Sequence, residues 1–170
     1  MSSGVQIRDM GSEVSTSLIE LIYRELLTPT FGPDELDTLD TVLDGLVKGS
    51  YEAWGLCALD GETPVGCVLG YPYALGDPYG DSRALLIGYL AVKRGLRGGG
   101  IGRELMGAAR ERWYGEPNID LVVAEIEDPR RYPAGNDIYP EKRVKFYAAG
   151  GAQIVAGPYF QPKLEGKGKK

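Results

Sequence analysis

One stretch of the sequence decides the fold: residues 84–105, which read ALLIGYLAVKRGLRGGGIGREL. Residues 84–92 are apolar or small, as expected of a buried strand, and a turn rich in glycine follows them. An amphipathic helix is predicted from Gly102 to about Trp113, with Leu105, Met106 and Ala109 facing inward. Backbone N–H groups can point into such a turn unobstructed, and the helix N-terminus adds a partial positive charge. The stretch therefore predicts a cradle for a phosphate or pyrophosphate group.

Four basic side chains surround this turn: Lys93, Arg94, Arg97 and Arg103. Among phosphate-binding motifs, the dinucleotide-binding pattern G-x-G-x-x-G does not match the spacing of the glycines in this turn. A P-loop is excluded as well, because Ile101 follows Gly100 where that motif requires Lys. The pattern Arg-x-x-Gly-x-Gly does fit, with Arg97, Gly100 and Gly102. Its place between a buried strand and an amphipathic helix makes this short match more specific.

The length and composition are those of one globular domain. The chain has 170 residues, 43% hydrophobic and 25% charged. We expect a single domain over residues 1–164 and a disordered Gly/Lys-rich tail over residues 165–170. No apolar run approaches the roughly 18–20 residues that span a bilayer. Residues 1–5 lack the basic-then-apolar pattern of a signal peptide, so we expect a cytoplasmic protein with no membrane partner.

The chain contains no histidine, which removes whole classes of chemistry. Ser-His-Asp and Cys-His catalysis are excluded, and so are zinc sites that use histidine. Two cysteines, Cys57 and Cys67, cannot complete a structural zinc site by themselves, so no metal is expected. They could face one another in a hairpin, but buried free thiols are the favoured interpretation. Catalysis would have to use carboxylates, tyrosines, lysines and backbone amides.

Charge is distributed unevenly along the chain. The net charge of −5 argues against nucleic acid as a partner. Residues 10–65 carry eleven acidic side chains against only Arg24 and Lys48, whereas fifteen Lys or Arg occur from Lys93 onward. Solvated helix faces would explain the acidic part, and recognition of a cationic ligand is the alternative.

The segments before the decisive stretch predict a strand, two helices and a hairpin. A strand is expected over residues 5–8, followed by a helix capped by Ser12 and ended by the Thr28-Pro29 pair. A second helix should start near Pro33 and close at Gly49. Residues 54–59 and 65–71 are expected to form the two strands of a hairpin, with the turn at residues 60–63.

The segments after it predict further strands around one helix. Residues 120–126 are expected to form a second buried strand, and residues 128–140 a loop. A short helix is predicted over residues 141–149. Residues 153–156 and 159–164 resemble closing strands. The resulting order, β-α-α-β-β-β-α-β-α-β, predicts an α/β fold with a mixed sheet.

This element order, and residues 90–105 most sharply, resemble the GNAT superfamily of acyl-CoA-dependent N-acyltransferases. The resemblance implies a mixed, mostly antiparallel central sheet flanked by helices, with acetyl-CoA as co-substrate. In that family the Arg/Gln-x-x-Gly-x-Gly loop binds the CoA pyrophosphate, and the end of the preceding strand pairs with the pantetheine arm. The cofactor-binding residues implied here are Leu90, Ala91, Val92, Arg97, Gly98, Gly99, Gly100, Ile101, Gly102 and Arg103.

Residues 143–152, RVKFYAAGGA, resemble the tyrosine-bearing helix of the same family. The resemblance implies that Tyr147 is the general acid that protonates the departing CoA thiolate. A phenol with an ordinary pKa of ~10 is protonated at neutral pH and can donate. The alternative is a core aromatic residue beside Phe146. Pro140 stands where the family often has asparagine.

The general base is expected to be a carboxylate, acting directly or through water. The strand over residues 84–92 carries no acid, although the family often has its base there. Glu125 and Glu127 alternate on the predicted strand and would share one face, which makes Glu125 the first candidate and Glu127 the second. They could instead pair with Arg130, Arg131 or Arg143. The backbone N–H near Val92 is the candidate donor to the thioester oxygen.

The long loop over residues 132–140 could line the acceptor site, with Tyr132 and Tyr139 as walls. The acidic first third suits a cationic primary amine, either a small molecule or a protein lysine. We therefore predict an N-acetyltransferase. The alternative is a non-catalytic acyl-CoA-binding or regulatory module on the same fold. Similar proteins are often dimers, which leaves a homodimer open.

Overall fold

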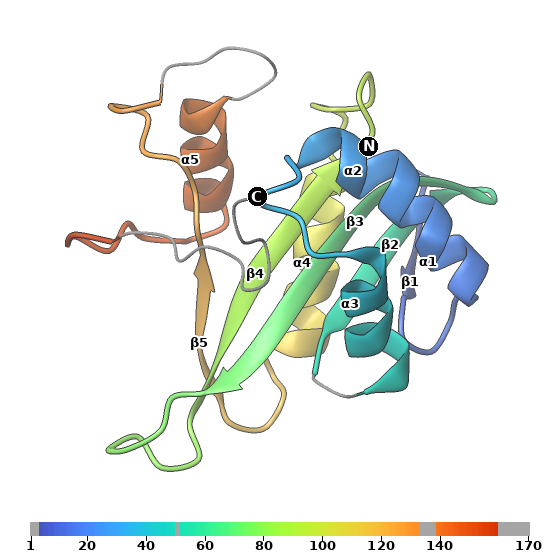
Figure 1. Ribbon diagram of the computed structural model, residues 1–170. Helices are drawn as coiled ribbons and strands as arrows, with labels where there is room; N and C mark the ends of the chain where they lie inside the picture. The colour runs from blue at the N-terminus through green and yellow to red at the C-terminus, as the bar shows by residue number, and fades with distance from the viewer. Residues whose placement is uncertain (1–3, 50–51, 133–138, 160–170) are drawn as a thin grey trace, which may run out of the picture. The chain divides into compact units, whose positions relative to one another are not determined.

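The computed structural model describes residues 4–49, 52–132 and 139–159, and its centre is a five-stranded sheet in the order β1-β2-β3-β4-β5 (Figure 1). The strands are β1 (Gln6–Asp9), β2 (Trp54–Asp60), β3 (Thr63–Ala74), β4 (Arg83–Val92) and β5 (Ile119–Ala124). The first four pair in antiparallel fashion. β5 runs in the same direction as β4, and α4 (Ile101–Trp113) makes the crossover between them. The predicted mixed α/β sheet is confirmed.

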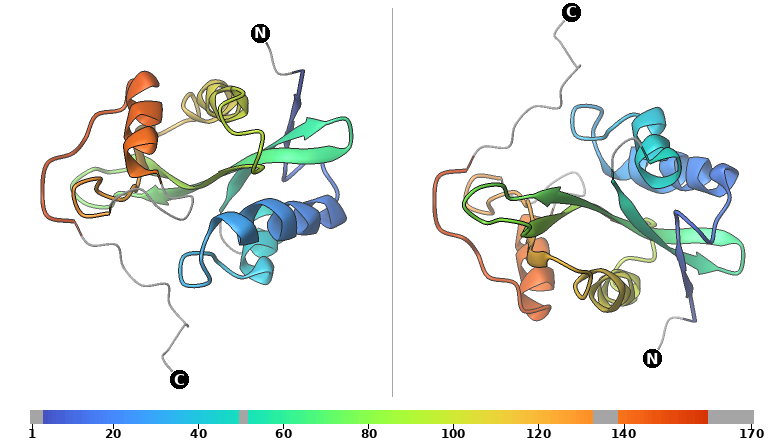
Figure 2. Two further views of the ribbon diagram at one scale, coloured as in Figure 1. Left: turned by 90° about the horizontal axis from the view of Figure 1, so that it is seen from above. Right: turned by 90° about the horizontal axis from the view of Figure 1, so that it is seen from below.

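The helices cover both faces of the sheet (Figure 2). One face carries α1 (Thr16–Ile22), η1 (Tyr23–Leu27), α2 (Thr28–Thr30), α3 (Leu39–Leu43) and η2 (Asp44–Lys48). The other face carries α4, which buries Ile101, Leu105, Ala109 and Trp113. Because successive strand residues point to opposite faces, β2 and β3 supply side chains to both hydrophobic clusters.

The first helical segment starts later and runs further than the sequence predicts. Ser15, not Ser12, caps α1, and its side chain accepts a hydrogen bond from Leu18 N–H. The Ser12 hydroxyl is used elsewhere, since it lies 3.0 Å from the Asp9 carboxylate. The helical path continues past the Thr28-Pro29 pair to Thr30. Proline is tolerated in the first turn of α2, where its missing N–H is not required.

The second helical segment also starts later than predicted. Thr38 caps α3 with its side chain, so Pro33 lies before the helix. Gly49 ends η2 in a left-handed conformation with φ of 75°, as the sequence predicted. The hairpin of β2 and β3 and the strand β4 lie where the sequence places them.

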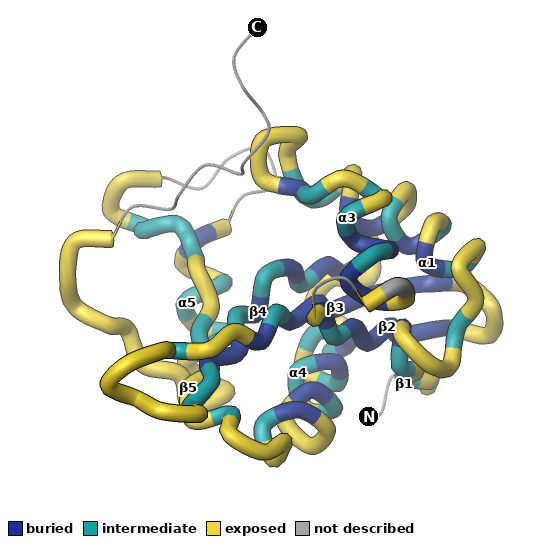
Figure 3. The backbone as a smooth tube through the Cα atoms, turned by 60° about the horizontal axis from the view of Figure 1, so that its bottom comes forward, coloured by how far each residue is buried: buried dark blue, intermediate teal, exposed yellow. Residues whose placement is uncertain are grey.

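The C-terminal strands are where the prediction differs most from the structure. β5 ends at Ala124 and is not a buried strand: Leu121 is 48% exposed, because β5 lies at an edge of the sheet order (Figure 3). Residues 153–156 form no strand and are exposed. The second predicted closing strand, residues 159–164, lies outside the described residues after Tyr159.

The described residues form two compact units, the first ending at Val123 and the second beginning at Ala124. The second unit contains the helix α5 (Pro140–Ala149), which starts one residue before its predicted position. In the described parts of the chain, no helix combines the length and apolar character needed to cross a bilayer.

A β-bulge at Gly88 interrupts the pairing of β4 with β3. Leu69 pairs with Tyr89 and Gly70 with Ile87, so Gly88 is the extra residue. The Tyr71 ring covers this glycine, because a Cβ atom added there would lie 2.5 Å from a ring carbon. Tyr71 in turn packs edge-on against Tyr89, with 6.1 Å between the ring centroids. The bulge and the aromatic pair therefore depend on glycine at this position.

Cys57 and Cys67 face one another across β2 and β3 as fully buried free thiols, which confirms the favoured interpretation. Burial raises the pKa of Cys57 to about 11. Burial and the neighbouring Cys57 also raise the pKa of Cys67. Since the thiolate is the reactive form, both cysteines should be inert in the folded protein at neutral pH.

Thiol labelling tests this placement. Native protein at pH 8 should not react with Ellman's reagent, and both cysteines should react after unfolding in guanidinium. The variant Ser17→Cys, at an exposed position of α1, should add one thiol that reacts in the native state. Rapid labelling of either natural cysteine without denaturant would contradict their burial.

Substitution of the bulge glycine should destabilise the fold. Gly88→Ala forces the Tyr71 ring to move, and overpacking of this kind costs about 1–3 kcal/mol in the free energy of unfolding, measured in urea. Gly107→Ala is the matched control, because the added methyl meets nothing within 4 Å on α4. The loss at Gly88 should shrink in a Tyr71→Leu background. Unchanged stability of Gly88→Ala would show that the bulge does not require glycine.

Candidate functional site

The glycine-rich turn between β4 and α4 exposes the N-terminus of that helix. Gly95, Gly98 and Gly100 have φ values of 89°, 86° and 94°, which only glycine adopts easily. Gly100 is the N-cap of α4, and no side chain caps the helix there. The first N–H groups of a helix have no intrahelical acceptor, so those of α4 are available to an external anion.

Two glycines of β3 set the position of this helix on the sheet. A Cβ atom at Gly66 would lie 2.9 Å from Ile101 Cγ2 and 3.0 Å from Leu105 Cδ1. A Cβ atom at Gly70 would lie 3.1 Å from the Trp113 ring, at the other end of α4. Both ends of the helix therefore rest against glycine, and the start of α4 is held next to the end of β4.

On the side away from β3, no strand of the described residues continues beside the last residues of β4, and we call this the open backbone edge. Lys93 N–H donates to Val65 O at 2.9 Å, so by the alternation of an antiparallel ladder the Val92 and Leu90 N–H groups point away from β3. On the other side, Arg83 N–H donates to Asn118 O at 2.7 Å. β5 thus starts level with β4, and because it is shorter it ends before Leu90.

Arg97 links this open edge to the glycine-rich turn. Its Nε donates to the Val92 carbonyl at 3.2 Å. A pocket of ≈ 210 Å³ lies beside this contact, and the residues that line it are Glu25, Leu26, Pro29, Thr30, Val92, Lys93, Arg94 and Arg97. The structure therefore brings the predicted residues Val92 and Arg97 together at one pocket.

The helical wall of this pocket was not predicted. Residues 25–30 carry no motif that marks them as part of a site. They reach the end of β4 only because η1 and α2 pack on the same face of the sheet as the Tyr89 side chain. The sequence signal that could have drawn attention to them is Pro29 inside a helical segment.

Both predicted bases lie in the second unit, beyond the end of β5. The prediction that they share one face of a strand is therefore wrong, because the strand stops at Ala124. Arg143 Nη1 donates to both oxygens of Glu127, at 2.8 and 2.6 Å, so this carboxylate is held in an ion pair. Glu125 accepts a hydrogen bond from the Tyr159 hydroxyl.

The predicted acid and the predicted acceptor walls also lie in the second unit. Tyr147 is half-buried on α5, with its ring centroid 5.2 Å from that of Phe146. Tyr139 is 41% exposed and stacks under the Lys142 ammonium, 4.3 Å from the ring centroid. Tyr132 is 57% exposed. Residues 133–138 of the predicted acceptor loop lie outside the described residues.

Solved structures with the same fold include acetyltransferases. An aminoglycoside acetyltransferase from an uncultured soil metagenomic sample has a TM-score of 0.65 at 16% identity, over 94% of this chain and 98% of that one. A ribosomal-protein-alanine N-acetyltransferase from Brucella melitensis has a TM-score of 0.62 at 18% identity, over 94% and 99%. A transcriptional regulator from Bacillus halodurans has 0.65 at 19% identity, over 93% and 99%. At these identities the likeness establishes the fold.

The sequence itself matches a family model. No curated protein sequence matches the chain. The acetyltransferase (GNAT) family model, however, matches residues 19–136, which include the end of α1, the other helices of the first face, the glycine-rich turn, α4 and β5. With the sheet order and the exposed start of α4, this match shows that the chain belongs to the GNAT acetyltransferase family.

Proposed function

We propose that the protein transfers an acetyl group from acetyl-CoA to a primary amine, by direct attack of the amine on the thioester. The observation that carries this proposal is the uncapped, glycine-rich start of α4 beside the open backbone edge of β4. The uncapped helix start suits a phosphate group, and the open strand edge suits an extended arm that contains amides. CoA has both groups, because its pantetheine arm is attached to its pyrophosphate.

The residues of the turn fit the pyrophosphate. Backbone N–H groups of Gly98, Gly100, Ile101, Gly102 and Arg103 would hold it at the positive end of the helix dipole, whereas the Gly99 N–H donates to the Leu96 carbonyl at 3.3 Å. Lys93, Arg94, Arg97 and Arg103 would add charge attraction. Residues 90–92 would pair with the pantetheine arm through backbone groups that point away from β3.

Acetyl-CoA supplies an activated thioester, and the chain would supply proton transfer and stabilisation of charge. Glu125, directly or through water, would take the proton that the ammonium must lose before its nitrogen forms the C–N bond. Glu127 is the second candidate, although its ion pair with Arg143 makes it less free to do so. As the C–S bond breaks, Tyr147 would protonate the sulfur. The Val92 N–H would donate to the thioester oxygen.

The acceptor is proposed to be a cationic amine, either a small molecule or a protein lysine. Eleven acidic side chains between residues 10 and 65, against two basic ones, favour a cationic acceptor. The names of the similar structures point the same way, since an aminoglycoside and a ribosomal protein both offer amines. Tyr132 and Tyr139 would line the acceptor site.

A second candidate function is a non-catalytic acyl-CoA-binding or regulatory module on this fold. It is favoured by the lack of any carboxylate on β4, whose residues read RALLIGYLAV. One of the similar structures is described as a transcriptional regulator. The two functions share acyl-CoA binding and differ in turnover, so release of free thiol in the presence of amines separates them.

Calorimetric titration tests the cofactor. Acetyl-CoA and desulfo-CoA should bind with micromolar affinity, and NADH should not. Gly100→Ala should weaken acetyl-CoA binding about tenfold, because a side chain at φ of 94° strains the turn by roughly 1–2 kcal/mol. Gly107→Ala, on the same helix, should bind as the wild type does. Unchanged affinity of Gly100→Ala would contradict the pyrophosphate assignment.

Replacement of the proposed acid tests the catalytic step. Tyr147→Phe should lower kcat about 100-fold while acetyl-CoA affinity is retained, because only the donated proton is lost. Tyr79→Phe, at an exposed position between β3 and β4, should keep full activity. Full activity of Tyr147→Phe would mean that another group, or water, protonates the thiolate.

A further inference from the structure

The short helix α2 separates two pockets of the first unit. Pro29 and Thr30 line the pocket beside Arg97, described above. Thr28 and Phe31 line a second pocket, also of ≈ 210 Å³. We name the second one the aromatic pocket, and its lining residues are Tyr23, Thr28, Phe31, Pro33, Leu36 and Thr38.

The lining of the aromatic pocket suits a single apolar ring. Two aromatic rings, a proline and a leucine form most of its wall, with two threonine hydroxyls, and none of these six described residues is charged. Its volume is below the ~300–1,000 Å³ typical of sites that enclose a whole drug-sized ligand. It therefore fits one ring or a branched alkyl group better than an oligosaccharide or a peptide.

Acidic residues alternate with the lining residues along the chain. Asp34 and Glu35 are exposed between Pro33 and Leu36, and Asp37 follows Leu36. Two tyrosines hold this segment: Tyr23 donates to the Asp37 carbonyl at 2.8 Å, and the Tyr89 hydroxyl accepts from the Asp37 N–H at 3.0 Å. The segment that forms part of the pocket wall therefore also carries three acidic side chains, which complement an ammonium group.

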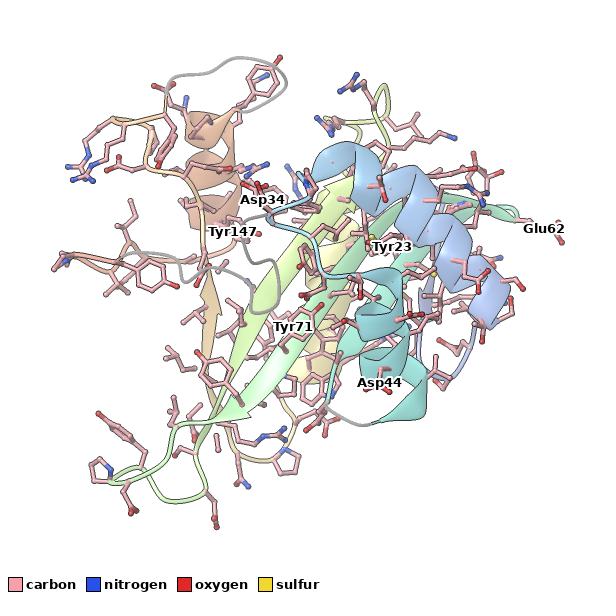
Figure 4. All side chains as sticks on the ribbon, viewed as in Figure 1. Tyr23, Asp34, Asp44, Glu62, Tyr71 and Tyr147 are labelled. Carbon is pink, nitrogen blue, oxygen red and sulfur yellow. The ribbon has the colours of Figure 1, made fainter. Side chains whose placement is uncertain are left out.

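A lining residue of the aromatic pocket contacts a side chain of β4. The Phe31 ring packs edge-on against Tyr89, with 5.0 Å between centroids. Tyr89 follows the bulge at Gly88 and precedes Leu90, where the open backbone edge begins. Tyr23 and Tyr71 lie over the same face of the sheet (Figure 4). The pocket therefore lies over the sheet face to which Tyr89 of β4 points, and β4 is the strand proposed to hold the pantetheine arm.

We propose that the aromatic pocket binds the aryl group of the acceptor, which makes the preferred substrate an arylalkylamine with one aromatic ring. This inference rests on the proposed acetyl transfer and narrows it to one class of amine. The ring packs between Tyr23 and Phe31. The ammonium of the acceptor lies outside the apolar wall, toward the acidic side chains of residues 34–37.

A matched pair of amines tests the inference. Thiol release from acetyl-CoA is measured with 2-phenylethylamine and with butylamine. kcat/KM for 2-phenylethylamine should be at least about tenfold higher, as expected when one apolar group is buried in a fitting pocket. Thr28→Met, which fills the pocket, should lower kcat/KM for 2-phenylethylamine about tenfold and lower that for butylamine by a smaller factor. Phe31→Leu, which keeps an apolar contact with Tyr89, should act in the same direction.

Thr16→Met is the control, because Thr16 is an exposed threonine of α1 that lines neither pocket. It should leave both rates unchanged. Equal kcat/KM for the two amines, or an equal effect of Thr28→Met on both, would overturn this inference and leave the proposed acetyl transfer standing. Failure of the wild type to bind acetyl-CoA in the calorimeter would overturn both.

Discussion

The arrangement of the first unit depends on how closely α4 approaches the sheet. Gly66 and Gly70 leave room for Ile101, Leu105 and Trp113, which would otherwise collide with a strand side chain. Helices normally pack at a distance set by the side chains between them and their neighbours. Here the missing side chains let the helix N-terminus lie beside the last residues of β4. A ligand whose phosphate binds at that N-terminus could therefore place an attached extended chain along the edge of β4.

The edge of β4 is open because β5 ends before β4 does. On the opposite edge of β4, the bulge at Gly88 shifts the pairing with β3. An unpaired strand edge normally risks association with other chains. Arg97 satisfies the Val92 carbonyl in this structure, and its guanidinium belongs to the same turn that exposes the start of α4. One basic side chain thus links the two features that a CoA molecule requires.

The opposite side of α2 has a different character. The pocket beside Arg97 is lined by three basic residues and Glu25, whereas the wall of the aromatic pocket is uncharged and is formed in part by a segment with three acidic residues. This division matches the two substrates of an acetyltransferase, since the donor carries phosphates and the acceptor carries an ammonium. Hydrogen bonds hold the acidic segment in place, since the Tyr23 hydroxyl donates to the Asp37 carbonyl and the Tyr89 hydroxyl accepts from the Asp37 N–H. The face of the sheet that packs the core therefore also positions the residues proposed to select the amine.

The sequence by itself determined the sheet class, the hairpin, β4, α4 and the glycine-rich turn, because periodicity, turn residues and glycine placement are local properties. It also determined the buried free state of Cys57 and Cys67. Only the tertiary structure decided where β5 ends, that Glu127 is paired with Arg143, and that two pockets flank α2. Strand ends, ion pairs and cavities depend on residues far apart in the chain, so no local pattern encodes them. Residues 25–30 line a pocket for the same reason: packing on a shared face brings them to β4.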